Sequence, residues 1–569
     1  MTFTSEGVKN KHFKSTFVAE RKNNMSKKIV SLLLAACMMF SVCACGNSKE
    51  TQAPEKSSEV QSSEVAQQTQ SSESVEEEKP LYPLVDEPIT VTGLVVGNPQ
   101  GEKYRTVWNK VSEITNVNFE WIIIDKEALN TFLASDWEFD FIHSMNISSS
   151  IIGDYGVLGG KFADYNDYLD LMPHLQKAFE DYPEAVKFVR ETNGAIYELP
   201  MIGESATRTQ IRTYYRTDLL DKYDIPVPTT TEELYQALKT YKEKNGTAGF
   251  SGKGLREDRY WGAMLYCAFG TSLSADFEDD GTGKVVFNRT SDQYKHYLEY
   301  MHKLYSEGLI QQEYLTNDAS VCLGLATNGD TVFYDTEAHS LSADIWSDGN
   351  FYLDVLAPLS SEYSDDREVP YSFNFGKGGL LLNAESEHLD VLVQALDIMY
   401  ANEEVVEGSG LHGTSFCYGI DGVDYIKYDD GTYELVWPEK YESMTDYQYQ
   451  ELIWENAGLS TDLANYITRT PGNAQARQKG FVNNIHPYES DPSKVYPTNF
   501  LRFTTDEQDV ITNRYTDINS YVKEMRDKFI QGVVDFEKGW DDYCATIESM
   551  HIDEVLEAQQ AAYDRWNQN

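Results

Sequence analysis

Short apolar runs and segments of helical spacing alternate along the chain from residue 84 onward. Ile89–Val96, Val117–Ile124 and Phe139–His143 are rich in β-branched or aromatic residues and are predicted as strands, with a helix over Lys103–Ile114. Strands that alternate with helices form βαβ units around a sheet with parallel strands. The pattern therefore predicts an α/β fold.

Two loops of this region are predicted to line a binding cleft. Ligands of open α/β sheets bind at the carboxyl ends of the strands, which here lead into loops 97–101 and 144–150. The small polar side chains of these loops are suited to hydrogen-bonding hydroxyl groups, and they are Asn98, Gln100, Ser144 and Asn146. Ordinary turn chemistry is the alternative explanation for the same residue types.

Further elements are predicted in the rest of the chain. Thr230 followed by Glu233 is a capping box, which predicts the start of a helix. Gly378–Leu382 is predicted as a strand. The predicted helices after it are Ser386–Ala401, Tyr515–Gly532, Trp540–Met550 and Asp553–Trp566.

The longest apolar run lies near the N-terminus and has the parts of an export signal. Two lysines precede the run Ile29–Val42, which ends at Val42-Cys43-Ala44-Cys45. This ending resembles a bacterial lipobox, whose last cysteine, here Cys45, receives the lipid. Residues 1–44 are therefore predicted as a signal segment, in which Met25 is a plausible start. A transmembrane helix is the alternative, but it needs about 20 apolar residues, and a polar tract follows the run at once.

Residues 45–83 are predicted as a disordered tether behind this lipid anchor. The stretch from Gly46 to Pro80 is rich in Ser, Gln and Glu and has no aromatic residue. It cannot bury enough surface to offset its chain entropy. A flexible chain of this length spans about 30 to 35 Å. We therefore expect the folded part to be held at the extracellular face of a bacterial cell membrane.

Composition excludes several classes of function. The 569 residues include 47 Lys and Arg against 92 Asp and Glu, a formal net charge of −45, which repels nucleic acid and anionic lipid headgroups. The mean hydropathy of −0.48 excludes a polytopic membrane protein. With 41% hydrophobic and 13% aromatic residues, the chain can form a large core.

The remaining cysteines indicate neither a zinc site nor a redox motif. They are widely separated, and they are Cys267, Cys322, Cys417 and Cys544. Two disulfides are one possibility in an exported protein. Buried thiols are favoured, because a core of this size needs no covalent support.

Eight ordered motifs resemble those of a known family. Four of them occur in the first half of the folded part, and they are Phe162–Tyr165, Asn193–Pro200, Tyr214–Lys222 and Val227–Leu234. The other four are Tyr418–Tyr425, Lys528–Gly532, Trp540–Tyr543 and Gln559–Trp566. In this order they are similar to the motifs of the family 1 extracellular solute-binding proteins of ABC importers, in the large lipoprotein branch often called LplA-like. The resemblance covers about residues 80 to 569.

The resemblance implies a two-lobed, periplasmic-binding-protein-like α/β fold with several hinge crossings and C-terminal helices. We expect the first lobe to hold residues 84–205 and about 370–415. The second lobe would hold 206–365 and about 420–569. The resemblance also implies a monomer that closes over a ligand and delivers it to the permease subunits of an ABC importer, without a cofactor.

Metal binding is not expected. Some large members of this family carry a calcium loop of alternating Asp and Asn near the matching helix end. Here that segment reads Lys242-Glu243-Lys244-Asn245-Gly246-Thr247-Ala248-Gly249, which lacks oxygen ligands at alternate positions. Asp279–Gly283 and Asp429–Gly431 contain Asp-Gly and are predicted as hairpin turns.

The motifs of common enzyme classes are missing from the sequence. It contains no G-x-S-x-G, no H-E-x-x-H and no Walker A loop. We therefore predict no catalytic residue. A glycosidase needs only two carboxylates, however, and the sequence has 92 acidic residues, so a carbohydrate-degrading enzyme stays an alternative.

The surplus of aromatic residues favours a carbohydrate ligand. Sugar rings stack on aromatic faces while their hydroxyls bond to polar side chains, so a saccharide cleft combines both. The candidate ligand-binding residues beyond the two loops are Trp261, Tyr334, Asp335, Glu337, Tyr371, Phe373, Asn374, His412 and Trp437. Core packing is the alternative for any single ring.

Together these features predict a lipoprotein that binds an oligosaccharide for import. Two alternatives remain at this stage. One is a surface carbohydrate-degrading enzyme, and the other is a lipoprotein that captures peptides or other solutes.

Overall fold

The computed structural model describes one compact unit. The described residues are 81–97, 106–144, 147–203, 213–252, 261–270, 276–335, 353–371, 373, 375–436, 458–459, 467–469, 473–498 and 500–568. Within these ranges, no helix has both the length and the hydrophobicity needed to cross a bilayer. The predicted signal segment and nearly all of the predicted tether lie outside the described residues.

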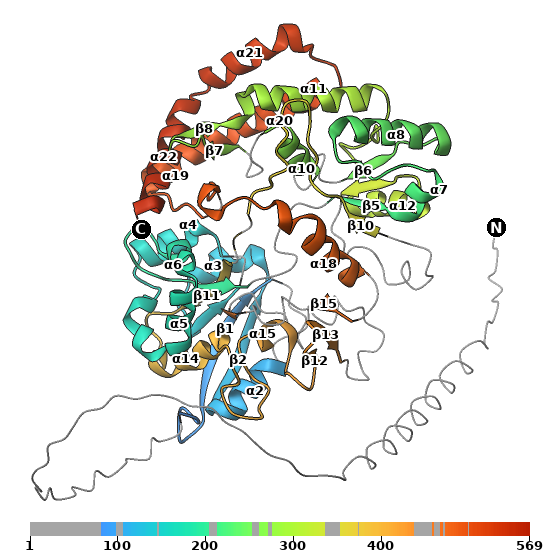
Figure 1. Ribbon diagram of the computed structural model, residues 1–569. Coiled ribbons are helices and arrows are strands. Elements are labelled where there is room, and N and C mark those ends of the chain that lie inside the picture. Colours follow the sequence, from blue (N-terminus) through green and yellow to red (C-terminus); the bar gives the residue numbers. More distant parts are fainter. Residues whose placement is uncertain are drawn as a thin grey trace, which may run out of the picture. The chain divides into compact units, whose positions relative to one another are not determined.

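A six-stranded mixed sheet organises the first part of the unit (Figure 1). Its strands, in spatial order, are β14 (Gly458–Leu459), β4 (Leu199–Ile202), β11 (Phe375–Leu382), β3 (Phe141–His143), β1 (Ile89–Val96) and β2 (Val117–Ile124). β1 is parallel to β2 and β3, whereas β11 is antiparallel to β3 and β4. Helix α2 (Thr106–Thr115) connects β1 to β2, so the predicted βαβ unit is confirmed.

Alternation along the strands separates two hydrophobic clusters on the faces of this sheet. In β1, Val91 and Val95 belong to one cluster, whereas Leu94 and Val96 belong to the other. Successive side chains of a strand point to opposite faces. The sheet is therefore covered on both faces, as expected for an α/β fold. The helical elements of this part are η1 (Lys126–Ala128), α3 (Leu129–Leu133), α4 (Ser149–Ile151), η2 (Ile152–Leu158), η3 (Tyr165–Leu171), α5 (Pro173–Asp181), α6 (Pro183–Val189), α14 (Leu389–Asp397), η6 (Ile398–Tyr400) and α15 (Ser415–Tyr418).

The observed strands agree with the sequence except at two ends. β1 and β2 have the predicted bounds. β3 begins at Phe141 rather than Phe139, because the Asp140 carboxylate accepts the Thr92 amide at 2.7 Å in place of a ladder carbonyl. β11 begins three residues earlier than predicted, at Phe375.

A second, four-stranded sheet organises the other part of the unit. Its strands, in spatial order, are β10 (Leu353–Val355), β5 (Tyr214–Arg216), β9 (Phe333–Asp335) and β6 (Phe250–Gly252). The helical elements that follow these strands in the chain or lie between them are α7 (Thr217–Lys222), α8 (Thr231–Asn245), α10 (Trp261–Ala268), η4 (Asn288–Thr290), α11 (Asp292–Ser306), α12 (Ala319–Asn328), α18 (Asn473–Asn484), η8 (His486–Tyr488) and η9 (Pro492–Lys494).

The C-terminal helices share the core of this second sheet. They are α19 (Thr505–Val510), the π-helical segment η10 (Ile511–Tyr515), α20 (Thr516–Ile530), α21 (Phe536–Ser549) and α22 (Ile552–Gln568). Their side chains Val522, Phe529, Trp540 and Val555 lie in the same cluster as Phe250 of β6. Three of these helices match the helices predicted from the sequence within a few residues.

The chain passes between the two sheets more than once. It passes from β4 to β5 and returns from β10 to β11. The chain also returns a second time, which the sequence did not predict. β14 lies after residue 420, in the stretch expected to belong to the second lobe, but it pairs in parallel with β4 of the first sheet. The first sheet thus takes strands from three separate stretches of sequence, which are 89–202, 375–382 and 458–459.

Two predicted hairpins and one predicted helix start are present. β7 (Phe277–Asp279) pairs with β8 (Val285–Phe287). β12 (Tyr425–Tyr428) pairs with β13 (Thr432–Leu435), which also contacts β15 (Ile467–Thr468). Thr230 caps α8 by accepting the Glu233 amide at 3.1 Å. The Glu233 carboxylate in turn accepts the Thr229 amide at 2.8 Å.

None of the four cysteines after Cys45 forms a disulfide. Cys267, Cys322 and Cys417 are buried and Cys544 is partly exposed. Burial raises the pKa of the Cys267 thiol. The prediction of mostly buried thiols is confirmed.

Candidate functional site

Five of the thirteen predicted ligand-binding residues have described side chains. They are Ser144, Tyr334, Tyr371, Phe373 and His412. Trp261 is the first residue of α10 and Asp335 is the last residue of β9, and the backbone alone is described for both. Asn98, Gln100, Asn146, Glu337, Asn374 and Trp437 lie outside the described residues.

Tyr334 is a core residue in this structure. Its side chain is 0% exposed and its ring stacks on Tyr214 of the neighbouring strand, with 5.5 Å between ring centroids. Burial raises the Tyr334 pKa well above its ordinary value. A ring without exposed surface has no face to offer a sugar, so core packing explains Tyr334 better than the predicted contact with a ligand.

His412 and Ser144 are also buried and make structural hydrogen bonds. His412 Nε2 lies 2.9 Å from the Tyr425 hydroxyl. This contact links the segment just before α15 to the first residue of β12. Ser144 Oγ donates to Val96 O at 3.0 Å, and its amide donates to Gly379 O at 2.7 Å. Ser144 therefore joins the ends of β1 and β3 to β11.

Among the predicted ligand-binding residues with described side chains, Tyr371 and Phe373 are the two rings that keep exposed surface. Both are half-buried and lie on the segment that connects β10 of the second sheet to β11 of the first. The two rings are nearly perpendicular, with centroids 5.9 Å apart. Phe373 also packs on Phe500 at 5.2 Å. A pair of partly exposed rings on a crossing segment can stack on a sugar that contacts both lobes.

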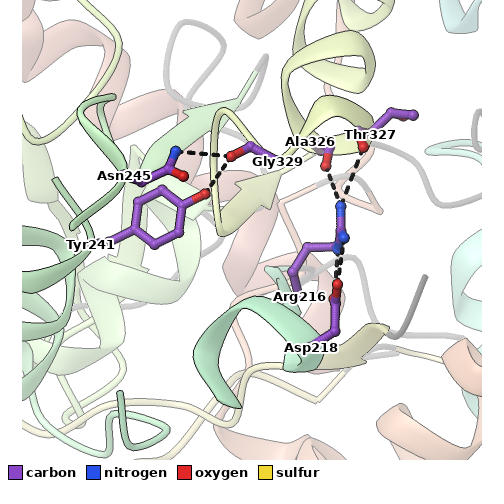
Figure 2. Close-up of polar contacts among 7 residues, drawn as sticks. All are labelled: Arg216, Asp218, Tyr241, Asn245, Ala326, Thr327 and Gly329. Atoms are coloured by element: carbon purple, nitrogen blue, oxygen red, sulfur yellow. Dashed lines mark hydrogen bonds and ion pairs between the residues drawn. The ribbon is translucent and has the colours of Figure 1, made fainter. Parts of the chain in front are cut away.

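A polar network fixes the strand that leads to the predicted residues Asp335 and Glu337. Figure 2 shows the carbonyls at the end of α12 and in the turn before β9 held by side chains from β5 and α8. Arg216 Nη1 donates to Ala326 O at 2.9 Å, and the same guanidinium pairs with Asp218. Tyr241 and Asn245 both donate to Gly329 O. Side chains of two other elements thus hold the backbone that leads into β9.

A group of buried charges at the first sheet was not predicted. Glu198, just before β4, is 3% exposed, and its Oε1 accepts the Gly379 amide at 2.9 Å. Burial raises the pKa of Glu198, while the nearby Lys377 and Arg502 oppose that shift. Burial also raises the pKa of Glu191, which pairs with Arg502. The sequence signal that could have located this group is Gly378-Gly379 inside a strand, since glycines there mark a bulge.

The segment at the end of α8 does not fit a calcium ion. Lys242 Nζ donates to Glu307 O at 2.6 Å, Lys244 Nζ donates to Tyr223 O, and Asn245 lies in the network of Figure 2. Calcium needs six to eight oxygen ligands, whereas nitrogen donors of this chain occupy the nearby carbonyls. In the described part of the chain, no group of three or more His, Cys, Asp or Glu side chains could hold a metal.

The two Asp-Gly segments use their carboxylates within their own turns. Asp279 Oδ1 accepts the Gly281 and Gly283 amides at 2.8 and 2.9 Å. Asp430 Oδ1 accepts the Thr432 amide at 3.1 Å. Both segments are hairpin turns, as predicted.

Sequence comparison finds relatives that match most of the chain. No protein-family model matches it. The fructooligosaccharide ABC transporter substrate-binding protein FusA of Streptococcus pneumoniae serotype 4 is 23% identical over 499 residues, which cover 83% of this chain and 89% of FusA. The lipoprotein LipO of Bacillus subtilis is 22% identical and covers 78% of this chain and 82% of its own. The polygalacturonan/rhamnogalacturonan-binding protein YtcQ of the same organism is 22% identical over 62% of this chain and 70% of its own.

Solved structures share the fold. A FusA EF-hand mutant in complex with fructo-nystose has a TM-score of 0.66 and 20% identity, covering 84% of this chain and all of that one. A solute-binding protein from Bifidobacterium longum infantis, described as binding HMO, has a TM-score of 0.67 at 20% identity with 84% and 99% coverage. The alginate-binding protein AlgQ2 without calcium ion has a TM-score of 0.61 at 19% identity, again with 84% and 99% coverage. The predicted two-lobed α/β fold is confirmed.

Proposed function

The chain is a relative of the extracellular solute-binding proteins of ABC importers, and we propose that it captures an oligosaccharide outside the cell and delivers it to such an importer. The observation that carries this proposal is the extent of the match to FusA, which covers 83% of this chain and 89% of the relative. A match of this length includes strands of both sheets. A binding site between two lobes needs both of them.

An oligosaccharide is the ligand class that the relatives favour. FusA is named for fructooligosaccharides, and YtcQ for polygalacturonan and rhamnogalacturonan. The half-buried rings of Tyr371 and Phe373, which lie on a segment between the two sheets, suit a ligand with apolar sugar faces. These two residues, together with the predicted residues outside the described ranges, form the ligand site in this proposal.

We assign no reaction to the protein. Its sequence relatives are named as binding proteins or as a lipoprotein, and the motifs of common hydrolases are missing from the sequence. The ligand is therefore released unchanged to the permease. This step needs no cofactor.

A lipid on Cys45 would keep the protein at the outer face of the cell membrane. The lipobox-like ending Val42-Cys43-Ala44-Cys45 supports this part of the proposal, and one relative is named as a lipoprotein. The tether up to residue 83 lets a monomeric binding protein reach its permease. In this proposal the first lobe holds residues 84–205 and about 370–415, and the second lobe holds 206–365 and about 420–569, except that β14 pairs with β4 and joins the first lobe.

Thermal-shift measurements with a set of glycans test the function. The set holds kestose, nystose, human-milk oligosaccharides, oligogalacturonate and alginate oligomers, and a peptide mixture serves as the control. A ligand at about 100 times its Kd adds about 2.7 kcal/mol of stability. We expect at least one oligosaccharide and no peptide to raise the Tm. Release of reducing sugar during incubation would instead indicate a carbohydrate-degrading enzyme.

A further inference from the structure

A bulge in β11 lies near the carboxyl end of β3 and the first residues of β4. The register against β4 shifts between Lys377, opposite Pro200, and Leu380, opposite Leu199. Gly379 has a φ of +69°, which favours glycine. Bulges re-aim side chains and are frequent beside functional sites.

Two contacts on opposite sides hold the bulge in place. The Gly379 carbonyl accepts the Ser144 amide at 2.7 Å, which ties the bulge to the carboxyl end of β3. The Gly379 amide donates to Glu198 Oε1 at 2.9 Å, inside the sheet. The backbone of the bulge is therefore held by hydrogen bonds on both sides.

Lys377 extends from this bulge toward the serine-rich end of the predicted cleft wall. Its Nζ atom lies 3.2 Å from Ser149 Oγ. Ser148, Ser149 and Ser150 are all exposed, and the hydroxyls of Ser148 and Ser150 are 2.7 Å apart. An ammonium has three N–H donors. Among the described residues, the contact with Ser149 uses one of them.

The carboxylates of Glu198 and Glu191 affect the pKa of Lys377 without forming an ion pair with it. Desolvation and, to a smaller extent, the Arg502 charge lower the pKa of Lys377, while Glu198 and Glu191 oppose that shift. Within the described residues, Lys377 forms no ion pair shorter than 4 Å with either carboxylate, whereas Arg502 pairs with Glu191 at 3.0 Å. Glu198 Oε2 has no hydrogen-bond partner there either.

This arrangement is unusual for a lysine with a purely structural role. A half-buried structural lysine is expected to satisfy its donors with a carboxylate, because leaving a buried charge unpaired is costly. Here the ammonium forms no ion pair with Glu198 or Glu191, and its Nζ atom contacts the exposed Ser149 hydroxyl beyond the carboxyl end of β3. In open α/β sheets the carboxyl ends of the strands are where ligands bind.

We propose that Lys377 is a ligand-binding residue of the first lobe, which donates hydrogen bonds to hydroxyl groups of the captured saccharide. This inference rests on the proposed function. Ser149 orients the ammonium, and the buried Glu198 stabilises its charge from behind. The three serine hydroxyls supply further donors and acceptors of the kind that sugar hydroxyls require.

The test measures how tightly each variant binds one glycan, namely the one that gives the unchanged protein its largest thermal shift. Lys377→Met should weaken its binding by about tenfold or more, as expected when hydrogen bonds from a charged donor are lost. Lys377→Arg should retain part of the affinity. Lys523→Met, on an exposed position of α20, is the matched control and should bind like the unchanged protein.

A second variant guards against a loss of folding in Lys377→Met. Ser149 is exposed, so Ser149→Ala should keep the Tm of the empty protein and still weaken binding, by a smaller factor than Lys377→Met. Full affinity in both Lys377→Met and Ser149→Ala would overturn the assignment of Lys377 while leaving the proposed function intact. If the unchanged protein binds no glycan of the set, the proposed function fails, and the role of Lys377 fails with it.

Discussion

Arg502 and Glu191 form an ion pair with 3.0 Å between Nε and Oε1, and each side chain is only 10% exposed. The same guanidinium donates to Phe188 O at 2.6 Å, near the end of α6. Arg565 of α22 donates in turn to Arg502 O at 2.9 Å. Arg502 thus contacts both α6, beside the first sheet, and the C-terminal helix α22.

Breaking this pair should destabilise the protein strongly. Arg502→Met leaves Glu191 as a buried charge without a partner, which costs about 3 to 5 kcal/mol of unfolding free energy. The matched control is Arg514→Met, because Arg514 pairs with Glu554 at 2.9 Å but both side chains are about 40% exposed. An exposed pair contributes about 0 to 1 kcal/mol. Urea unfolding measures both, and equal losses would contradict a buried link.

Two tyrosines that the sequence assigned to the same role should behave differently. Tyr334→Ala should lower the unfolding free energy by about 3 to 5 kcal/mol, because it removes a fully buried ring. Tyr371→Ala should instead weaken glycan binding by about 1 to 3 kcal/mol and change the Tm little, because its ring is half-buried. Calorimetry with thermal melts separates the outcomes. Unchanged affinity in a stable Tyr371→Ala variant would remove Tyr371 from the site.

The contrast between these residues shows what sequence could and could not predict. The bounds of β1 and β2 follow from local alternation between turns, and both were predicted correctly. Whether a ring faces a ligand or the core depends on distant partners, such as Tyr214 for Tyr334. The same holds for β14, a two-residue strand that pairs across some 250 positions of the chain with β4. The bulge at Lys377 was signalled by two glycines, but its contacts with Ser144 and Glu198 were not.

Calcium should have no effect on the stability of this protein. Lys242 Nζ caps the carbonyl of Glu307 at the end of α11, and Gly308 leaves room for it, since a Cβ there would lie 2.7 Å from Nζ. Neither EDTA nor about 1 mM CaCl2 should shift the Tm. That CaCl2 concentration is high enough to saturate calcium sites with the affinity of calcium-sensor proteins. Lys242→Met should lower the stability by about 1 kcal/mol, with Lys523→Met as the control. A calcium-dependent Tm would contradict this prediction.

Asp397 should make stability depend on pH in the acidic range. Burial raises its pKa to about 7, although its carboxylate accepts the Leu175 and His174 amides at the start of α5. The folded protein therefore holds this proton more tightly than the unfolded chain does. The protonated carboxyl contributes in full to the free energy of unfolding below about pH 4, and this contribution is lost as the pH rises through 7. Its size is at most about 4 kcal/mol. Asp397→Asn should flatten the decrease in stability between pH 4 and 7, and an unchanged pH profile would contradict the shift.

Lipid attachment depends on a single predicted residue. Cys45→Ser should abolish acyl labelling in a bacterial host and release the protein from the membrane fraction or leave it as a precursor. Cys417→Ser serves as the control, because that thiol is buried in the folded unit. Acyl label that persists in Cys45→Ser would place the anchor elsewhere or remove it.

The central claim is that this chain binds an oligosaccharide and releases it unchanged. Isothermal titration of the purified protein with the glycan that gives the largest thermal shift, followed by mass analysis of the recovered saccharide, tests this claim most directly. The account predicts saturable binding of one saccharide per chain and recovery of the intact glycan. Absence of binding across the glycan set, or recovery of shortened saccharides, would contradict it.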